Sequence, residues 1–301
     1  QDILEKFKFD GQITTMANKS ILYIVIKEFT SPRANLHPDV ISNLEMGYIF
    51  EEIIRRFSES HNEDAGQHYT PREVIQLMVN ILFYDDNDML SGNNVAKTIY
   101  DPACGTGGML SVAEEYLHQL NASTELMAFG QELNDQTFAI CKADMLIKGN
   151  NADFIKDGNT LSDDQFEGQT FDYVLSNPPY YPPKSGYLHA QDSLCAARSE
   201  ICCPFDALCA AAARALRWGG RFFLVHKPER LVDLLTGLRA ARLEPKRIRF
   251  VRHRAETAVN LVLIESRLGG GPGLQYEPDL ILYTQTGDLS AEGRRIYHLQ
   301  E

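Results

Sequence analysis

Apolar residues in the first part of the chain recur every three or four positions, which is the spacing of an amphipathic helix. Ile53, Ile54 and Phe57 form such a stripe among glutamate and arginine residues. This pattern predicts that residues 1–65 are helical and form a small N-terminal lobe packed against the rest of the chain. The remainder, residues 66–301, is expected to form one larger domain.

From residue 66 onward, helical and extended patterns alternate. A helix is predicted to start at Pro71 after a cap by Thr70, and residues 85–94 form a polar loop. Strands are expected within residues 97–103, 126–133, 153–161, 171–180, 221–227, 246–254 and 259–264, with an edge segment near 280–284. Helices are expected at 108–120, 136–149, 206–220 and 230–243. This order predicts an α/β fold with a mostly parallel, twisted sheet and helices on both faces.

The composition is that of a globular protein. Hydrophobic residues make up 44% and charged residues 23% of the 301 residues. No apolar run approaches the ~20 residues of a membrane span, so no membrane partner is expected. The start of the chain lacks the features of a signal peptide. The six cysteines show no regular framework, which favours a reduced, cytoplasmic setting. The group Cys195, Cys202, Cys203 and Cys209 lacks paired metal-ligand spacing, so buried thiols are expected there and no metal.

Charge and composition change abruptly within the chain. The net charge is −12, which argues against nonspecific nucleic-acid binding by the whole surface. Residues 1–180 carry a net charge of −16, whereas residues 181–301 carry +4. The Lys:Arg ratio changes from 8:4 to 3:14 across the same point. The change suggests that two sequence sources are joined within one fold, with the junction near residues 174–183.

The segment DPACGTGGML places an acidic residue and a glycine-rich turn between a strand and a helix. Glycines let a ligand approach the backbone, and the following helix offers unpaired N–H groups. The Lys-Ser/Thr of a phosphate-binding loop is absent, and Asp101 would repel a pyrophosphate. A carboxylate at this point attracts an α-ammonium or a sulfonium group. The segment therefore predicts a site for S-adenosylmethionine.

Two further strand ends carry polar groups that fit this prediction. Glu132 ends the next strand, where a carboxylate can accept hydrogen bonds from both ribose hydroxyls. In the segment NPPY, Asn177 and the carbonyl of Pro178 can both accept from one amino group, and Pro179 ends the strand. Tyr180 can stack on a base. This corner is suited to a flat ring with an exocyclic amine, such as an adenine flipped out of a duplex.

DPACGTGG, GQEL and NPPY, in this order and spacing, resemble the amino-methyltransferases that act on adenine N6. Residues 1–180 are similar to the modification (methylation) subunit of type I restriction-modification systems, through GYIFEEIIRRFSES, AGQHYTPREVIQLMV, IYDPACGTGGML, FGQELN and FDYVLSNPPY. The resemblance implies a Rossmann-like S-adenosylmethionine-dependent methyltransferase fold, DNA as substrate and a separate specificity subunit as partner. The later segments of those proteins, and much of their N-terminal helical region, have no counterpart in this sequence.

The resemblance also implies roles for individual residues. It places Tyr69, Thr70 and Pro71 at the methionine end of the cofactor, with Asp101, Ala103, Gly105 and Gly107 around its methionine moiety and Glu132 on its ribose. Asn159 would lie near the cofactor's adenine, where an acidic residue is more usual. Asn177, Pro178 and Tyr180 would hold the target adenine.

Residues from about 174 onward, including LRWGGRFFLVHKPERLVDLLTGLRAARLEPKRIRFVRHR, resemble methyltransferases that modify an anticodon-loop adenine of a tRNA. DNA adenine is therefore the favoured substrate and tRNA adenine the alternative. A third alternative is a folded hybrid that binds the cofactor and methylates nothing. The basic strand KRIRFVRHR is expected either to contact phosphates or to form a solvated face. His226 and His253 are interpreted as structural.

Overall fold

The computed structural model describes residues 9–37, 39–60, 72–84, 96–121, 123–178, 180 and 203–296. The strands are β1 (Ala96–Asp101), β2 (Glu125–Glu132), β3 (Ile155–Asp157), β4 (Phe171–Ser176), β5 (Leu216–His226), β6 (Leu243–Arg252), β7 (Val259–Leu268) and β8 (Gln275–Ile281). The α-helices are α2 (Phe9–Asn18), α3 (Leu22–Phe29), α4 (Asn43–Ser60), α5 (Arg72–Tyr84), α7 (Gly108–Leu120), α8 (Asp135–Lys148), α10 (Phe205–Ala215), α11 (Leu231–Ala240) and α12 (Ala291–Ile296).

All of these strands belong to one sheet, in the order β3-β2-β1-β4-β5-β7-β6-β8. Strands β3, β2, β1, β4 and β5 are parallel to one another. Strand β7 is antiparallel to both neighbours, β5 and β6, and β8 runs parallel to β6 at the edge. The mostly parallel sheet that the sequence predicts is therefore confirmed, and its carboxyl edge is the place where an open α/β sheet binds ligands.

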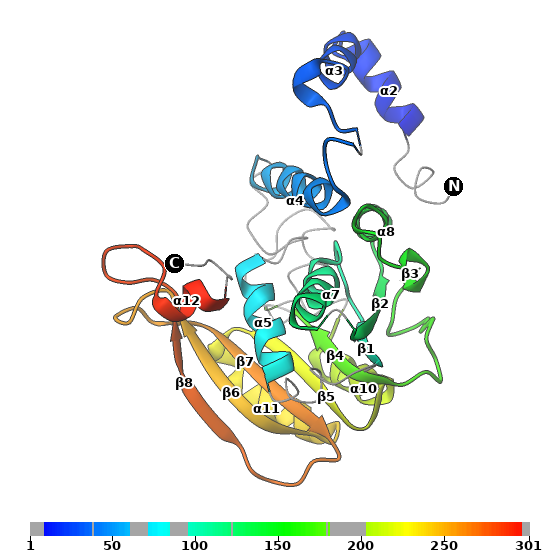
Figure 1. Cartoon of the computed structure of the whole chain (residues 1–301). Coiled ribbons are helices and arrows are strands. Elements are labelled where there is room, and N and C mark those ends of the chain that lie inside the picture. Colours follow the sequence, from blue (N-terminus) through cyan, green and yellow to red (C-terminus); the bar gives the residue numbers. More distant parts are fainter. Residues whose placement is uncertain are drawn as a thin grey trace.

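Helices cover both faces of the sheet (Figure 1). One apolar core lies under α5, α7 and α8, and a second lies under α10 and α11. Strand β4 shows the alternation that creates these cores, because Tyr173 and Leu175 belong to the first and Val174 to the second. Residues buried on both faces explain why the central strands are nearly continuous apolar runs.

The described N-terminal residues are largely helical, as the apolar spacing predicts. Helix α4 packs on α8, and the Tyr48 hydroxyl donates a 2.7 Å hydrogen bond to Glu115 of α7. Helices α2 and α3 contact each other, and neither contains a buried residue. Figure 1 shows this pair beyond α4, away from the sheet. None of the helices in the described part of the chain combines the length and the apolarity needed to cross a membrane.

The predicted helix over residues 206–220 is wrong at its end. Helix α10 ends at Ala215, and β5 begins at Leu216, which pairs with Phe171 of β4. The alanines favour a helix, but the side chain of Leu216 is buried in the second core and draws the backbone into the sheet. Gly219, with φ of 79°, lies in a bulge of β5 instead of ending the helix. The edge segment predicted near 280–284 is strand β8, which starts earlier, at Gln275.

Candidate functional site

Asp101 is the last residue of β1, and its side chain is fully buried. Its Oδ1 accepts a 3.1 Å hydrogen bond from the Ala103 N–H, whereas no described residue donates to its Oδ2. Burial raises the pKa of this carboxyl group to about 8, the Ala103 N–H lowers it, and the Glu132 carboxylate raises it. A buried acceptor without a donor is costly, so the site is suited to a ligand that brings a cation.

The turn after Asp101 depends on glycine at two positions. Gly105 and Gly107 have φ of 56° and 81°, a backbone region that residues with a Cβ rarely adopt. A Cβ on Gly107 would lie 2.5 Å from Sγ of Cys141 on α8. Gly107 is also the residue before α7, so its turn presents the unpaired N–H groups of that helix at the sheet's carboxyl edge.

Glu132, at the end of β2, connects this turn to the neighbouring strand. Its Oε2 accepts a 2.9 Å hydrogen bond from the Gly105 N–H, and its Oε1 accepts a 2.8 Å bond from the Asn134 N–H. Asn134 in turn caps α8 by accepting from Gln136 and Thr137. The carboxylate that the sequence assigns to a ribose therefore also holds the glycine turn in position, a role that residue spacing does not reveal.

Asn159 lies in the turn after β3. Its Oδ1 accepts a 2.9 Å hydrogen bond from the Leu161 N–H. The next residue, Thr160, donates a 2.5 Å hydrogen bond to the carbonyl of Pro102 in the glycine-rich turn. The structure thus places Asn159 beside the segment that contains Asp101 and Ala103.

The NPPY corner follows β4. Asn177 is half-buried and Pro178 is buried. The Tyr180 hydroxyl donates a 2.6 Å hydrogen bond to Oδ1 of Asn177. Pro179 lies outside the described residues, as do Tyr69, Thr70 and Pro71 from the predicted cofactor site.

Two residues at the end of β5 contact this corner, although the sequence interpretation treats one as structural and does not mention the other. The His226 ring lies 5.1 Å from the Tyr180 ring, edge to face, and is fully buried. The Lys227 ammonium lies 5.8 Å from the centre of the same ring. The sequence does hold a signal for this contact. Residues 221–227 form the next predicted strand after NPPY, and consecutive strands of a sheet are usually neighbours, so the end of this strand is expected near NPPY.

Asp101 and Asn177 lie at the same edge of the sheet. Strands β1 and β4 are parallel neighbours, and Tyr100 pairs with Val174. Asp101 is thus level with Leu175, two residues before Asn177. With neighbouring strands about 4.8 Å apart and a rise of about 3.3 Å per residue, the two Cα atoms are separated by on the order of 8 Å. The arrangement can hold a cationic ligand and a flat amine side by side.

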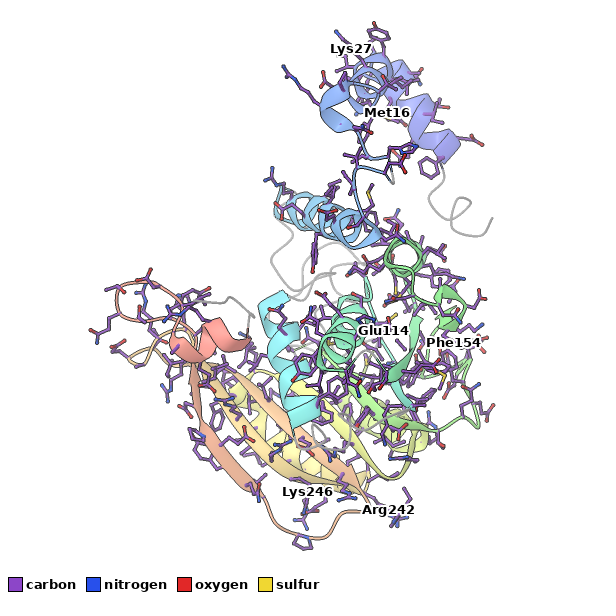
Figure 2. The ribbon with its side chains drawn as sticks, viewed as in Figure 1. Met16, Lys27, Glu114, Phe154, Arg242 and Lys246 are labelled. Carbon is purple, nitrogen blue, oxygen red and sulfur yellow. The ribbon has the colours of Figure 1, made fainter. Side chains whose placement is uncertain are left out.

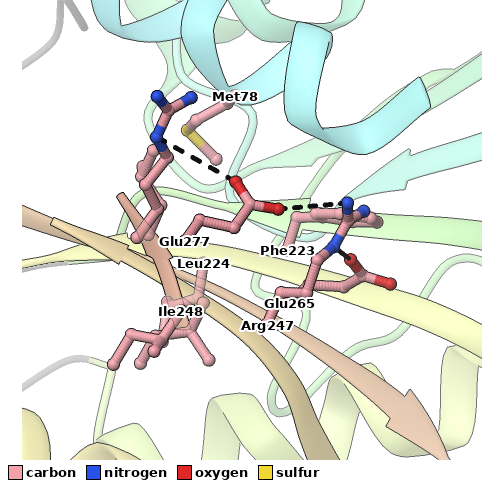
Figure 3. Close-up of a pocket in the computed structure, with 10 residues that line it drawn as sticks. Met78, Phe223, Leu224, Arg247, Ile248, Glu265 and Glu277 are labelled. Atoms are coloured by element: carbon pink, nitrogen blue, oxygen red, sulfur yellow. Dashed lines mark hydrogen bonds and ion pairs between the residues drawn. The ribbon is translucent and has the colours of Figure 1, made fainter. Parts of the chain in front are cut away.

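The basic strand β6 does not present a row of arginines to a partner. Arg247 is buried and pairs with Glu265 at 2.5 Å and with Glu277 at 3.2 Å, and Figure 3 shows these carboxylates on both sides of it. Arg249 pairs with Glu292 at 2.5 Å, and Arg252 pairs with Asp279 of β8 at 2.6 Å. These ion pairs connect β6 to β7, β8 and α12, so phosphate contact by these three arginines is not supported.

Comparison with known proteins identifies the family. The family model named N-6 DNA Methylase matches residues 42–193, which is half of the chain and includes the glycine turn, Glu132 and NPPY. The chain belongs to the N-6 DNA methylase family. The methylase subunit of the type I restriction enzyme MjaIX from Methanocaldococcus jannaschii is 34% identical over 135 residues, which are 44% of this chain and 22% of that relative. The chain thus spans about a fifth of the length of that curated relative.

Solved structures show the same fold. The methyltransferase subunit of a type I restriction-modification system from Streptococcus thermophilus superposes with a TM-score of 0.55 and 19% identity over 78% of this chain and 53% of that one. A class I S-adenosylmethionine-dependent methyltransferase from Listeria monocytogenes superposes with a TM-score of 0.56 and 12% identity over 90% of this chain and 83% of that one. The chain therefore has the Rossmann-like methyltransferase fold that the motifs predict.

Proposed function

We propose that the chain transfers a methyl group from S-adenosylmethionine to the exocyclic N6 amine of adenine in DNA. The observation that carries the proposal is the placement of Asp101 and Asn177 at the carboxyl ends of adjacent parallel strands. The family match and the type I methylase relative support the same reaction class.

The residues around the glycine turn fit S-adenosylmethionine. The buried Oδ2 of Asp101, to which no described residue donates, is an acceptor for the α-ammonium group. Ala103, Gly105 and Gly107 would line the methionine moiety, and Glu132 would accept from the ribose. Asn159 would lie at the adenine, and Tyr69, Thr70 and Pro71 at the methionine end. When bound, S-adenosylmethionine supplies an electrophilic methyl group on its sulfonium.

The NPPY corner would hold the target adenine. Oδ1 of Asn177 and the carbonyl of Pro178 would accept from the N6 amine and stabilise positive charge as it grows on nitrogen. Pro179 makes the corner rigid, and Tyr180 would stack on the base. The amine needs no strong base, because water can take its proton after it has gained the methyl group. In-line placement of the sulfonium methyl group and the N6 amine would supply much of the remaining rate acceleration.

The same proposal includes the domains of the chain and its binding partners. Residues 1–65 would form a helical lobe, and residues 66–301 the catalytic domain, with a sequence junction near 174–183. DNA is the favoured substrate, and a separate specificity subunit is the proposed partner. The resemblance of the C-terminal part to tRNA methyltransferases supports tRNA adenine as the second candidate.

Two measurements test the proposal. Calorimetry with S-adenosylmethionine should show binding by the wild type and by Asn177→Ala. Tritiated methyl groups should then appear in duplex DNA with the wild type and not with Asn177→Ala, while unmodified tRNA tests the second candidate. Cofactor binding without incorporation into either nucleic acid would overturn the proposed activity and support a non-catalytic hybrid.

A further inference from the structure

The only tryptophan of the chain is exposed at the edge of the sheet opposite the NPPY corner. Trp218 lies near the start of β5, and 68% of its surface is accessible. Strand β5 runs from Leu216 to His226, which contacts Tyr180. At about 3.3 Å per residue, Trp218 lies roughly 25 Å from the end of the strand that contacts the NPPY corner. Tryptophan is highly buried on average, so an indole this exposed is available to stack on a ligand.

Arg242 lies over this indole in a strained conformation. Its guanidinium carbon lies 5.2 Å from the ring centre. It follows the end of α11 with φ of 63°, where helices usually have glycine. Among the described residues, no carboxylate lies within ion-pair distance of Arg242. Strained backbone conformations cluster at functional sites. An exposed, strained arginine without an acidic partner is therefore a candidate for ligand binding.

Three more cations lie at this end of the sheet, and one of them, Arg267, contacts the residue next to Trp218. Arg267 donates to the carbonyl of Gly219 at 3.0 Å, and Lys246 donates to the carbonyl of Gly271 at 2.7 Å. Arg217 is more than half exposed and pairs with Asp172 at 2.6 Å. We call Arg217, Trp218, Arg242, Lys246 and Arg267 the Trp218 patch. Figure 2 shows Arg242 and Lys246 together at this end of the sheet.

The surroundings of the patch connect these side chains. The backbone N–H of Gly269 donates to the carbonyl of Arg242 at 3.0 Å. Gly269 also lies against the indole, because a Cβ on it would be 2.3 Å from the Trp218 ring. The guanidinium groups of Arg242 and Arg267 are therefore held beside one accessible aromatic ring, on a chain whose net charge is −12. Such a local concentration of positive charge favours an anionic partner.

We propose that the Trp218 patch binds an unpaired nucleotide and the adjacent phosphates of a nucleic-acid strand. An exposed indole can stack on any base that is not paired, and guanidinium and ammonium groups donate to phosphate oxygens. The patch is separate from the adenine corner. At about 3.4 Å per nucleotide, a strand would need roughly eight nucleotides to reach from one to the other. The inference does not require the proposed methyl transfer.

Because the chain has a single tryptophan, its fluorescence reports directly on this patch. Single-stranded 20-mers of thymidylate and of uridylate should quench the emission of the full chain to saturation, and added salt should weaken the binding. Quenching by either strand supports the inference, and the tighter of the two shows which sugar is preferred. Unchanged emission at oligonucleotide concentrations that saturate binding, measured by anisotropy of a labelled 20-mer, would overturn it.

Variants locate the binding. Trp218→Ala and Arg242→Ala should each weaken binding of the labelled 20-mer by about 10-fold. Arg242→Gly should weaken it similarly while folding at least as stably, because glycine adopts this φ without strain. Tyr23→Ala, which removes a 74% exposed ring on α3, and Arg56→Ala on α4 serve as controls with unchanged affinity. Affinities of the Trp218 and Arg242 variants within twofold of the wild type would refute the site.

Discussion

The Tyr180 hydroxyl donates a 2.6 Å hydrogen bond to Oδ1 of Asn177, the atom proposed to accept from the target amine. The phenol thus donates to the oxygen that the proposed N6 amine would use. The His226 ring, 5.1 Å away, and the Lys227 ammonium, 5.8 Å away, position the Tyr180 ring from the next strand. Because an amide oxygen has two lone pairs, an adenine bound at this corner would either share Oδ1 of Asn177 with the Tyr180 hydroxyl or displace it.

The hydroxyl and the ring of Tyr180 are expected to have separable effects. Tyr180→Phe removes the competing donor and keeps the ring, so methylation should persist with an unchanged or lower KM for nucleic acid. Tyr180→Ala also removes the stacking surface and should lower kcat/KM by about 10- to 100-fold. Steady-state methylation of one DNA substrate by both variants makes the comparison. Equal losses in Phe and Ala variants would contradict a stacking role.

Asp101 should release a proton when the cofactor binds. Burial raises its pKa to about 8, so the carboxyl group is mostly protonated in the free protein at pH 7. A bound ammonium favours the carboxylate and lowers the pKa. Calorimetry in two buffers of different ionisation enthalpy should show proton release by the wild type and none by Asp101→Asn. Equal release by both would assign the proton to another group.

The same shift predicts a pH dependence of stability. The native state keeps a proton on Asp101 that the unfolded chain releases above about pH 4. The contribution of Asp101 to the free energy of unfolding therefore decreases as the pH rises from about 4 to 8. Denaturant unfolding across this range should show a shallower decrease for Asp101→Asn than for the wild type. A steeper decrease in the variant would contradict the raised pKa.

Gly107→Ala should destabilise the turn through backbone strain and through steric overlap. Gly149→Ala measures the effect of the strain alone. Both Gly107 and Gly149 have φ near 82°, but only at Gly107 would a Cβ meet the Cys141 sulfur, at 2.5 Å. Gly149→Ala should lower the free energy of unfolding by the backbone strain alone, about 1 kcal/mol. Gly107→Ala should cost at least about 1 kcal/mol more, since overlap is added to strain, and should weaken cofactor binding. Equal costs in urea unfolding would rule out the predicted overlap.

Arg247 is expected to act in stability instead of nucleic-acid binding. Replacing it with alanine removes the 2.5 Å partner of the buried Glu265, which keeps Arg221 at 3.7 Å, so the cost should be about 3 kcal/mol, the lower end for a broken buried pair. Arg252→Ala breaks a more exposed pair and should cost about 1 kcal/mol or less. Urea unfolding measures both, and the Arg252 variant should bind a DNA duplex normally. A large loss of DNA affinity with normal stability would restore the phosphate-contact interpretation.

Local sequence is enough to predict the elements whose signals lie within a few residues. Helix α7 runs over residues 108–120 as predicted, because a glycine turn precedes an apolar stripe. The strand ends could also be assigned, because each short apolar run stops at or just before a polar residue: Asp101, Glu132 and Asn177. The start of β5 at Leu216 could not be predicted, because burial of that leucine overrides the helix propensity of the alanines before it.

Contacts between distant segments were not predictable from local sequence. The acidic partners of Arg249 and Arg252 come from the segment 277–292, and they meet β6 only because β8 adds to the edge in parallel. The hydrogen bond from Gly105 to Glu132 likewise links residues 27 positions apart. Such pairs depend on the register between strands, which residue spacing along the chain does not encode.

The most direct measurement is nucleoside mass spectrometry after incubation of duplex DNA with S-adenosylmethionine carrying a deuterated methyl group. The wild type should produce labelled N6-methyldeoxyadenosine, and Asn177→Ala should produce almost none while it still binds the cofactor in calorimetry. If the wild type binds the cofactor but no labelled N6-methyladenine forms, or if Asn177→Ala forms as much as the wild type, the adenine-methylation proposal is wrong.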